Sequence, residues 1–206
     1  LKARVDDMNA NGILGSICFP AFPNFAGTYF LGAKDKELAK IMISAYNDWH
    51  VDEWCAGAPG RFIPLAILPL WDINACVAEA RRVAAKGVRT ISFLDNPTAK
   101  GLPSVHSDHW DPLWAVMEEL GLVISCHIGS GASAPYPSAD APIDAWIVNM
   151  PMYIANAATE WLFSPVFKKF KNLKIALSEG GIGWVPYWLE RADFTYKHHH
   201  AWTHRN

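Results

Sequence analysis

Short apolar runs alternate along the chain with segments in which apolar positions recur every three or four residues. The runs are rich in branched and aromatic side chains and mostly lack alternating polar positions, which is typical of strands buried on both faces. Pro64 interrupts one run and removes a backbone donor there. We predict five strands, over Ile13–Phe19, Phe62–Leu68, Val88–Leu94, Leu122–Cys126 and Leu173–Leu177.

The segments between these runs have the pattern of amphipathic helices. Asp35 is placed to cap a helix whose apolar stripe runs from Leu38 to Trp49. Gly87 and Gly121 follow two further helical segments, at the position where a left-handed turn favours glycine. Alternation of strands and helices indicates an α/β fold with a parallel sheet and right-handed crossovers.

The loops at the two ends of the predicted strands differ in length. Helix-to-strand connections are one or two residues long, whereas three long segments connect strands to helices: Pro20–Lys34, Asp95–Trp110 and Ile128–Pro142. Long loops after the strands are typical of barrel enzymes, and no Gly-x-Gly-x-x-Gly motif follows the first run. We therefore predict one domain over residues 1–206 that forms part of a (β/α)8 TIM barrel, with about five central units present.

Composition and charge narrow the possible partners. The 206 residues have a formal net charge of −2, which argues against a nucleic-acid partner. No apolar run reaches the roughly 18 residues that a membrane span needs. The four cysteines form no Cys-x-x-Cys pair, which is typical of reduced thiols in a cytosolic protein. We expect a cytoplasmic protein that acts on a small molecule.

Two ionisable residues directly follow apolar strand cores and precede glycines. His127 comes after Leu-Val-Ile-Ser-Cys, and Glu179 comes after Ile-Ala-Leu-Ser. In a parallel barrel both would lie at the carboxyl ends of the strands, where the imidazole can bind a metal and the carboxylate can bind it or move a proton. The alternative for His127 is a structural hydrogen bond, and the alternative for Glu179 is that it only orients a ligand or pairs with a cation.

Other polar residues are weaker candidates for a site. Asp95 follows a third strand, where it either lines the substrate pocket or forms an Asp-Asn-Pro turn. His106 and His109 lie in the next loop and are further candidates for substrate binding. The histidines of residues 197–204 are expected to belong to a solvated helix end. No Gly-x-Ser-x-Gly elbow is present, which argues against a serine hydrolase.

Two segments carry a resemblance to a known family. They are Val-Ile-Ser-Cys-His-Ile-Gly-Ser-Gly from Val123 and Asn-Leu-Lys-Ile-Ala-Leu-Ser-Glu-Gly-Gly-Ile-Gly-Trp-Val-Pro from Asn172. Both resemble the amidohydrolase-related family that contains aminocarboxymuconate-semialdehyde decarboxylase and the resorcylate-type decarboxylases. Arg61–Leu70, Tyr46–Trp49 and Leu189–Asp193 extend the resemblance over nearly the whole chain.

The resemblance implies a distorted (β/α)8 barrel that holds a divalent metal, usually zinc and sometimes manganese. Of the family's ligands, a His-x-His pair on strand one, a histidine on strand five and an aspartate on strand eight, only the strand-five histidine has a counterpart, at His127. We therefore expect a fragment without strands one, seven and eight, inactive by itself, from a parent that forms homo-oligomers. Decarboxylases of the family place a catalytic histidine where this sequence has Glu179.

Three functions remain open on the sequence. The leading one is a metal-dependent hydrolase of a small organic acid, amide, ester or lactone, with His127 as ligand and Glu179 as the catalytic base. An ionised Glu179 suits taking a proton from a metal-bound water, which favours hydrolysis. The alternatives are a nonoxidative decarboxylase of an aromatic or unsaturated carboxylate and a non-catalytic barrel fragment.

Overall fold

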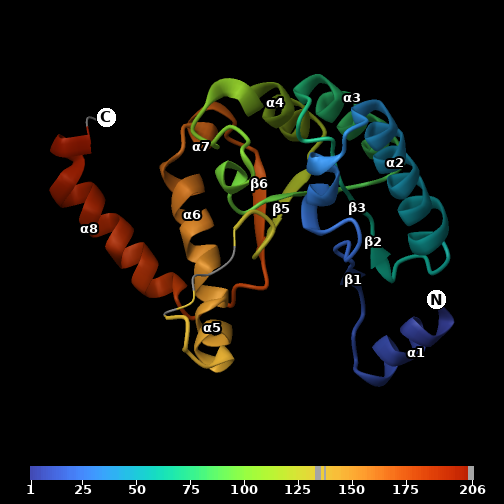
Figure 1. The fold of residues 1–206 in the computed structure, drawn as a ribbon, viewed down its shortest axis with the longest axis horizontal. Coiled ribbons are helices and arrows are strands. Elements are labelled where there is room, and N and C mark those ends of the chain that lie inside the picture. The colour runs from blue at the N-terminus through green and yellow to red at the C-terminus, as the bar shows by residue number, and fades with distance from the viewer. Residues whose placement is uncertain (133–135, 137, 204–206) are drawn as a thin grey trace.

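In the described residues the strands are parallel and lie in two sheets (Figure 1). The computed structural model describes residues 1–132, 136 and 138–203. A two-stranded sheet pairs β1 (Ser16–Ile17) with β2 (Phe62–Ile63). The second sheet has the order β3-β4-β5-β6, with the bounds Leu65–Ala66, Thr90–Leu94, Val123–His127 and Lys174–Ser178.

Each predicted strand region contains a strand. The bounds of the strands differ most from the prediction in the two N-terminal runs. The second run is divided at Pro64 into β2 and β3, because proline has no N–H to donate to a ladder. The first run narrows to the two residues of β1. The parallel arrangement is confirmed, and four sequential strands lie next to one another as a barrel requires.

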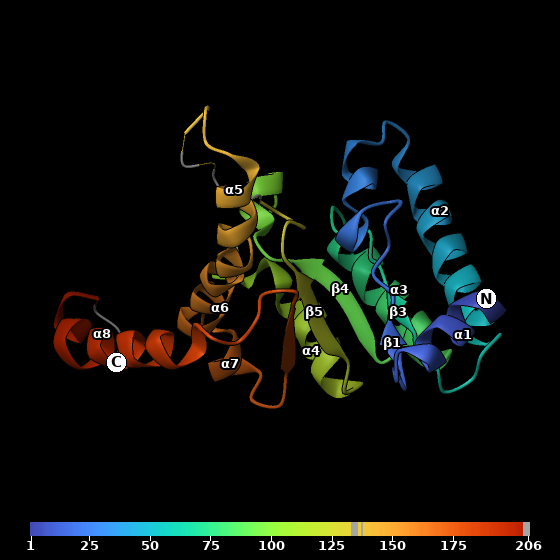
Figure 2. The same ribbon diagram turned by 90° about the horizontal axis from the view of Figure 1, so that it is seen from below.

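Helices cover the outer side of the sheets. Figures 1 and 2 show α2, α3 and α4 following one another along that side, with α6 beside β6. The α-helices are α1 (Lys2–Ala10), α2 (Lys36–Trp49), α3 (Ile73–Ala85), α4 (Asp111–Glu119), α5 (Ile143–Asn149), α6 (Ile154–Phe163), α7 (Val166–Lys169) and α8 (Val185–Thr203). Asp35 caps α2 by accepting from the Leu38 N–H at 2.9 Å, as the sequence predicts. Gly87 and Gly121 have positive φ, as their turns require.

The two faces of the sheet have different chemistry. Phe93 points from β4 into the helical layer, where its ring meets Trp110 and Trp114 at 5.1 Å each. On the opposite face the Thr90 and Ser125 hydroxyls are 2.7 Å apart. The apolar core therefore lies between sheet and helices, and the face turned away from the helices carries polar side chains.

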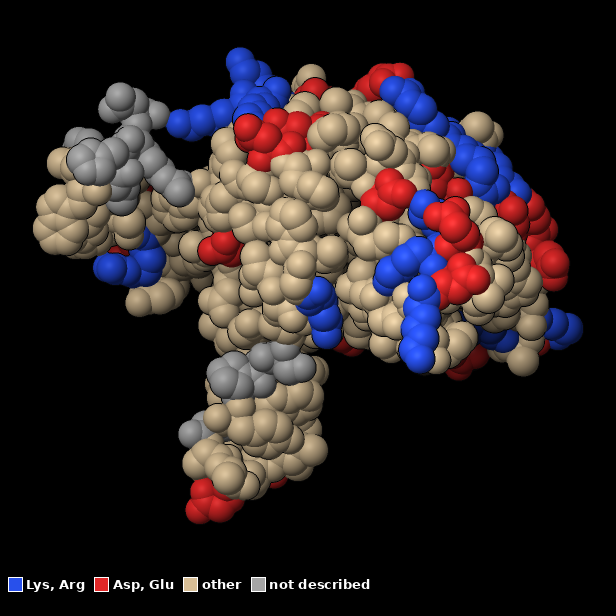
Figure 3. Space-filling model, turned by 45° about the horizontal axis from the view of Figure 1, so that its top comes forward, with Lys and Arg blue, Asp and Glu red and all other residues tan. Residues whose placement is uncertain are grey.

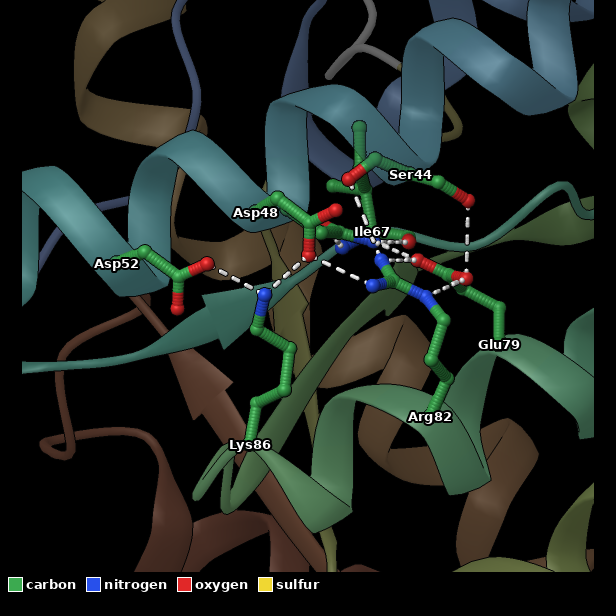
Figure 4. A network of polar contacts seen from close by, with 8 residues as sticks. Ser44, Asp48, Asp52, Ile67, Glu79, Arg82 and Lys86 are labelled. Carbon is green, nitrogen blue, oxygen red and sulfur yellow. Dashed lines mark hydrogen bonds and ion pairs between the residues drawn. The ribbon is translucent and has the colours of Figure 1, made fainter.

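A buried polar cluster joins α2 to α3 and to the sheet (Figure 4). The Glu79 carboxylate accepts from Asn47 at 2.7 Å, from Ser44 at 3.0 Å and from Arg82 at 2.8 Å. Burial by itself would raise the pKa of Glu79, but the hydrogen bonds from Arg82 and Asn47 outweigh it and hold that pKa below its usual range. The Asn47 amide also exchanges two hydrogen bonds with the Ile67 backbone, at 2.9 and 3.0 Å. This cluster fixes α2 against the end of β3.

The outer surface mixes both signs of charge. On the face shown in Figure 3, lysine and arginine side chains alternate with acidic ones over the helical side. None of the helices in the described part of the chain combines the length and apolar character that crossing a membrane requires.

Candidate active site

The carboxyl ends of β4, β5 and β6 bring three predicted site residues to one level. In the ladder, Leu94 pairs with His127, and His127 pairs with Ser178. Asp95 and Glu179 are the residues that directly follow β4 and β6. The predicted clustering of Asp95, His127 and Glu179 at one end of the sheet is thus confirmed.

His127 and Glu179 are in direct contact. The Nε2 atom of His127 lies 3.2 Å from an Oε atom of Glu179. The Nδ1 atom of His127 lies 2.8 Å from the carbonyl oxygen of Ile128. Because a carbonyl only accepts, Nδ1 must carry a proton and donate it. The backbone therefore fixes the imidazole with Nε2 directed toward Glu179.

Glu179 sits at a sharp turn after β6. Its φ is 66°, a left-handed conformation that is uncommon for a residue other than glycine. A Cβ atom on the next residue, Gly180, would lie 1.9 Å from the Ile154 side chain, so only glycine allows α6 to approach here. Strained backbone of this kind is frequent at functional sites. The turn lifts the Glu179 side chain out of the sheet, where 63% of it is exposed.

Two phenylalanines border His127. The Phe25 ring is stacked on the imidazole at a centroid distance of 3.9 Å, and Phe19 meets it edge-on at 4.8 Å. Sequence reasoning missed both. Phe19 lies two residues after β1 and so obeys the same strand-end rule as His127. Phe25 begins a short 3-10 helix (Phe25–Gly32) inside the segment predicted as a loop, where no pattern indicates its position. Together they give the imidazole an apolar wall, and only 10% of its side chain is exposed.

The carboxylate of Asp95 is engaged in hydrogen bonds to the backbone. It accepts from the N–H groups of Gly129, Gly131 and Ala132, at 2.9, 2.6 and 3.3 Å. Only 3% of Asp95 is exposed. Direct contact of Asp95 with a substrate stays a prediction, while its observed partners are all in the loop after β5.

The other predicted residues lie apart from this pair. His106 contacts Glu160 on α6, with 2.8 Å between Nε2 and Oε2, and His109 packs edge-on against Trp110. Within the described residues, neither histidine contacts His127 or Glu179. Their role in substrate binding stays a prediction. Of the histidines in residues 197–204, His204 lies outside the described residues.

The donor set fits part of a metal site. His127 offers an orientated Nε2 and Glu179 a carboxylate beside it, and nitrogen and oxygen donors suit both zinc and manganese. No group of three or more potential ligands occurs in the part of the chain that the structure describes. His127, with Glu179 beside it, would therefore need further ligands to complete a metal site.

Comparison with known proteins assigns the family. The family model described as amidohydrolase matches residues 2–205. The chain belongs to this amidohydrolase family. Its structural likeness to amidohydrolase barrels, together with the parallel sheet, confirms a partial (β/α)8 TIM barrel.

Several relatives with named reactions are decarboxylases. The chain is 27% identical over 160 residues to 2-amino-3-carboxymuconate-6-semialdehyde decarboxylase of Dictyostelium discoideum, covering 74% of this chain and 41% of the relative. It resembles 2,6-dihydroxybenzoate decarboxylase from Rhizobium, with a TM-score of 0.68, 24% identity and coverage of 98% and 61%. It also resembles a dihydroxybenzoic acid decarboxylase from Polaromonas sp. JS666, solved with bound manganese, with a TM-score of 0.67, 23% identity and coverage of 97% and 59%. The chain thus spans less than two thirds of the length of each.

Proposed function

We propose that the protein is a nonoxidative decarboxylase of small aromatic or unsaturated carboxylates, and that the reaction occurs at the His127–Glu179 pair. The observation that carries the proposal is the 3.2 Å contact between these side chains at the strand ends, beside an aromatic wall. The curated relative supports it, because that protein is a decarboxylase. The proposal departs from the preference for hydrolysis that the sequence suggested.

Decarboxylation needs a proton donor beside the substrate carbon. Loss of CO₂ breaks a carbon–carbon bond and leaves the electron pair on carbon, so a proton must be delivered to that carbon. The Nδ1 proton of His127 is engaged by Ile128, and an unprotonated Nε2 and a carboxylate both only accept. To deliver a proton, Glu179 must therefore enter the reaction protonated, and its exposed carboxyl group can take that proton from solvent.

Each side chain then has a separate task. His127, held by the backbone, would serve as a ligand of a divalent metal, zinc or manganese. Glu179 would carry the proton to carbon, because its carboxyl group is exposed toward solvent, from which it can be reprotonated. A bound metal would polarise a substrate oxygen. Phe19 and Phe25 would contact the flat carbon frame of the substrate.

The test compares decarboxylation with ester and lactone hydrolysis, using the protein as its gene encodes it. Carboxyl-labelled 2,6-dihydroxybenzoate would be supplied with manganese or zinc, and released labelled CO₂ measured by mass spectrometry, beside a set of simple esters and lactones. We expect CO₂ release without ester or lactone hydrolysis, with one solvent deuterium entering the product at the vacated carbon in D₂O. Hydrolysis without CO₂ release would establish the hydrolase alternative. The absence of both reactions would favour a non-catalytic protein.

A further inference from the structure

The loop that follows His127 is held by one buried carboxylate. Both oxygens of Asp95 are engaged: Oδ2 accepts from Gly129, and Oδ1 accepts from Gly131 and Ala132. These three N–H groups all belong to the loop after β5, whereas Asp95 stands at the end of β4. Hydrogen bonds to a charged acceptor are stronger than neutral ones, and burial at 3% exposure protects them from water.

A second contact makes the attachment reciprocal. The Asp95 N–H donates to the hydroxyl of Ser130 at 2.9 Å, and the Ser130 N–H donates to the His127 carbonyl at 3.2 Å. A Cβ atom on Gly131 would lie 2.1 Å from the Asn96 carbonyl oxygen, so the loop passes as close to β4 as glycine permits. Hydrogen bonds in both directions therefore hold the loop against Asp95 and Asn96, the residues that follow β4.

The attachment reaches His127 through Ile128. Ile128 lies between His127 and the first anchored residue, Gly129, and its carbonyl orients the imidazole through Nδ1. Its N–H donates to the Ser178 carbonyl at 3.3 Å, on the neighbouring strand. A displacement of Gly129 would rotate the Ile128 peptide and release the imidazole from the orientation that directs Nε2 to Glu179.

We infer that Asp95 is a positioning residue for the reaction proposed above: it fixes the orientation of His127 through the Gly129–Ala132 loop, without contacting substrate. The inference rests on the proposed function for its chemical meaning. Groups that orient a functional histidine commonly change the activity or metal affinity of a site by about 10- to 100-fold when they are replaced. Asp95→Asn removes one acceptor, since the amide nitrogen opposite Gly129 donates rather than accepts.

Site-specific reactivity of His127 tests this inference without substrate or metal. The chain would be treated with diethyl pyrocarbonate, which acylates unprotonated imidazole nitrogen, and each histidine peptide followed by mass spectrometry. In the parent chain His127 should react slowly, because it is stacked on Phe25 and its Nε2 faces Glu179. Asp95→Asn should raise its rate by about tenfold, the factor expected for the loss of one hydrogen bond to a charged group.

His50 and Asn47 provide the control for general loosening. His50 is 2% exposed and lies on the segment after α2, away from the Asp95 loop. Asn47→Ala removes a buried amide three residues from it, so this variant should raise the rate at His50 and leave His127 unchanged. Asp95→Asn should show the opposite pattern, which a uniform loss of stability could not produce.

Ser130→Ala keeps the test decisive if Asp95→Asn does not fold. It removes only the acceptor of the Asp95 N–H, and it should also raise the His127 rate selectively. A His127 rate within about twofold of the parent in the folded variants, or one that rises together with His50, would overturn the positioning role. Neither result would bear on CO₂ release, so failure of this inference and failure of the proposed function remain distinguishable.

Discussion

At the scale of single residues, the site depends on how the backbone constrains two side chains. The Ile128 carbonyl fixes His127, and a left-handed turn aims Glu179. Their positions at strand ends could be predicted from the sequence, because an ionisable residue between an apolar run and glycines is a recognisable pattern. The stacking of Phe25 could not, since it depends on a loop with positive φ at Asn24 and Ala26.

A prediction at this scale concerns zinc. His127 supplies one of the roughly four ligands that zinc takes, so the 206-residue chain should bind it weakly. After dialysis against zinc and then buffer, elemental analysis should find far less than one equivalent, and His127→Ala should lower the remainder further. His106→Ala is the matched control and should change nothing. Near-stoichiometric zinc in the parent chain would show that the donor set is incorrectly assigned.

At the scale of elements, the alternation of strands and helices could be predicted from the sequence, but the contacts and boundaries where the elements meet could not. The apolar runs predicted all the strand regions, and Pro64 marked the interruption between β2 and β3. The π-helical segment His50–Cys55, which extends α2, leaves no periodic signal in so short a stretch. The hydrogen bonds between Asn47 and Ile67 could not be predicted from the sequence either. They join a helix to a strand end twenty residues later through one side chain.

The buried cluster of Figure 4 predicts a dependence of stability on acidity. The pKa of Glu79 is lower in the folded protein than its ordinary value of 4.5, so its contribution is present above that value and is lost as the pH falls through the folded-state pKa. Glu79→Gln should therefore cost about 2 kcal/mol of unfolding free energy near neutral pH and clearly less at an acidic pH below 4.5. Urea unfolding at both pH values measures this.

The exposed Glu53 on the segment after α2 provides the control. Glu53→Gln should leave the free energy of unfolding unchanged at either pH. An equal destabilisation by Glu79→Gln at both pH values would show that packing of the side chain, rather than its charge, holds α2 to α3.

At the scale of the whole molecule, the outer edge of β6 and much of the last helix are open to solvent among the described residues. β6 is the terminal strand of the second sheet, and α8 extends away from the rest of the molecule (Figures 1 and 2). Large apolar side chains of this region are open to solvent: Ile182 is 83% exposed, Tyr187 69% and Trp202 77%. The barrel class was predictable from loop lengths, but the direction of α8 was not, because its apolar residues occupy more than one side of the helix.

These surfaces predict self-association of the 206-residue chain. Unpaired strand edges and exposed apolar side chains favour contact between copies. Size-exclusion chromatography with light scattering should show dimers or larger species that dissociate on dilution, and Tyr187→Ser combined with Trp202→Ser should reduce their size. A stable monomer throughout the dilution series would contradict this prediction.

The central claim is that Glu179 delivers a proton to carbon at the His127 site, and one measurement tests it most directly. Glu179→Gln keeps the size of the side chain and removes its transferable proton, while Glu190→Gln on α8 is the matched control. In the protein as its gene encodes it, kcat for CO₂ release should fall by about 100-fold or more in Glu179→Gln and stay unchanged in Glu190→Gln. A kcat for Glu179→Gln within roughly twofold of the parent would contradict the account, because general acid catalysis contributes far more than that.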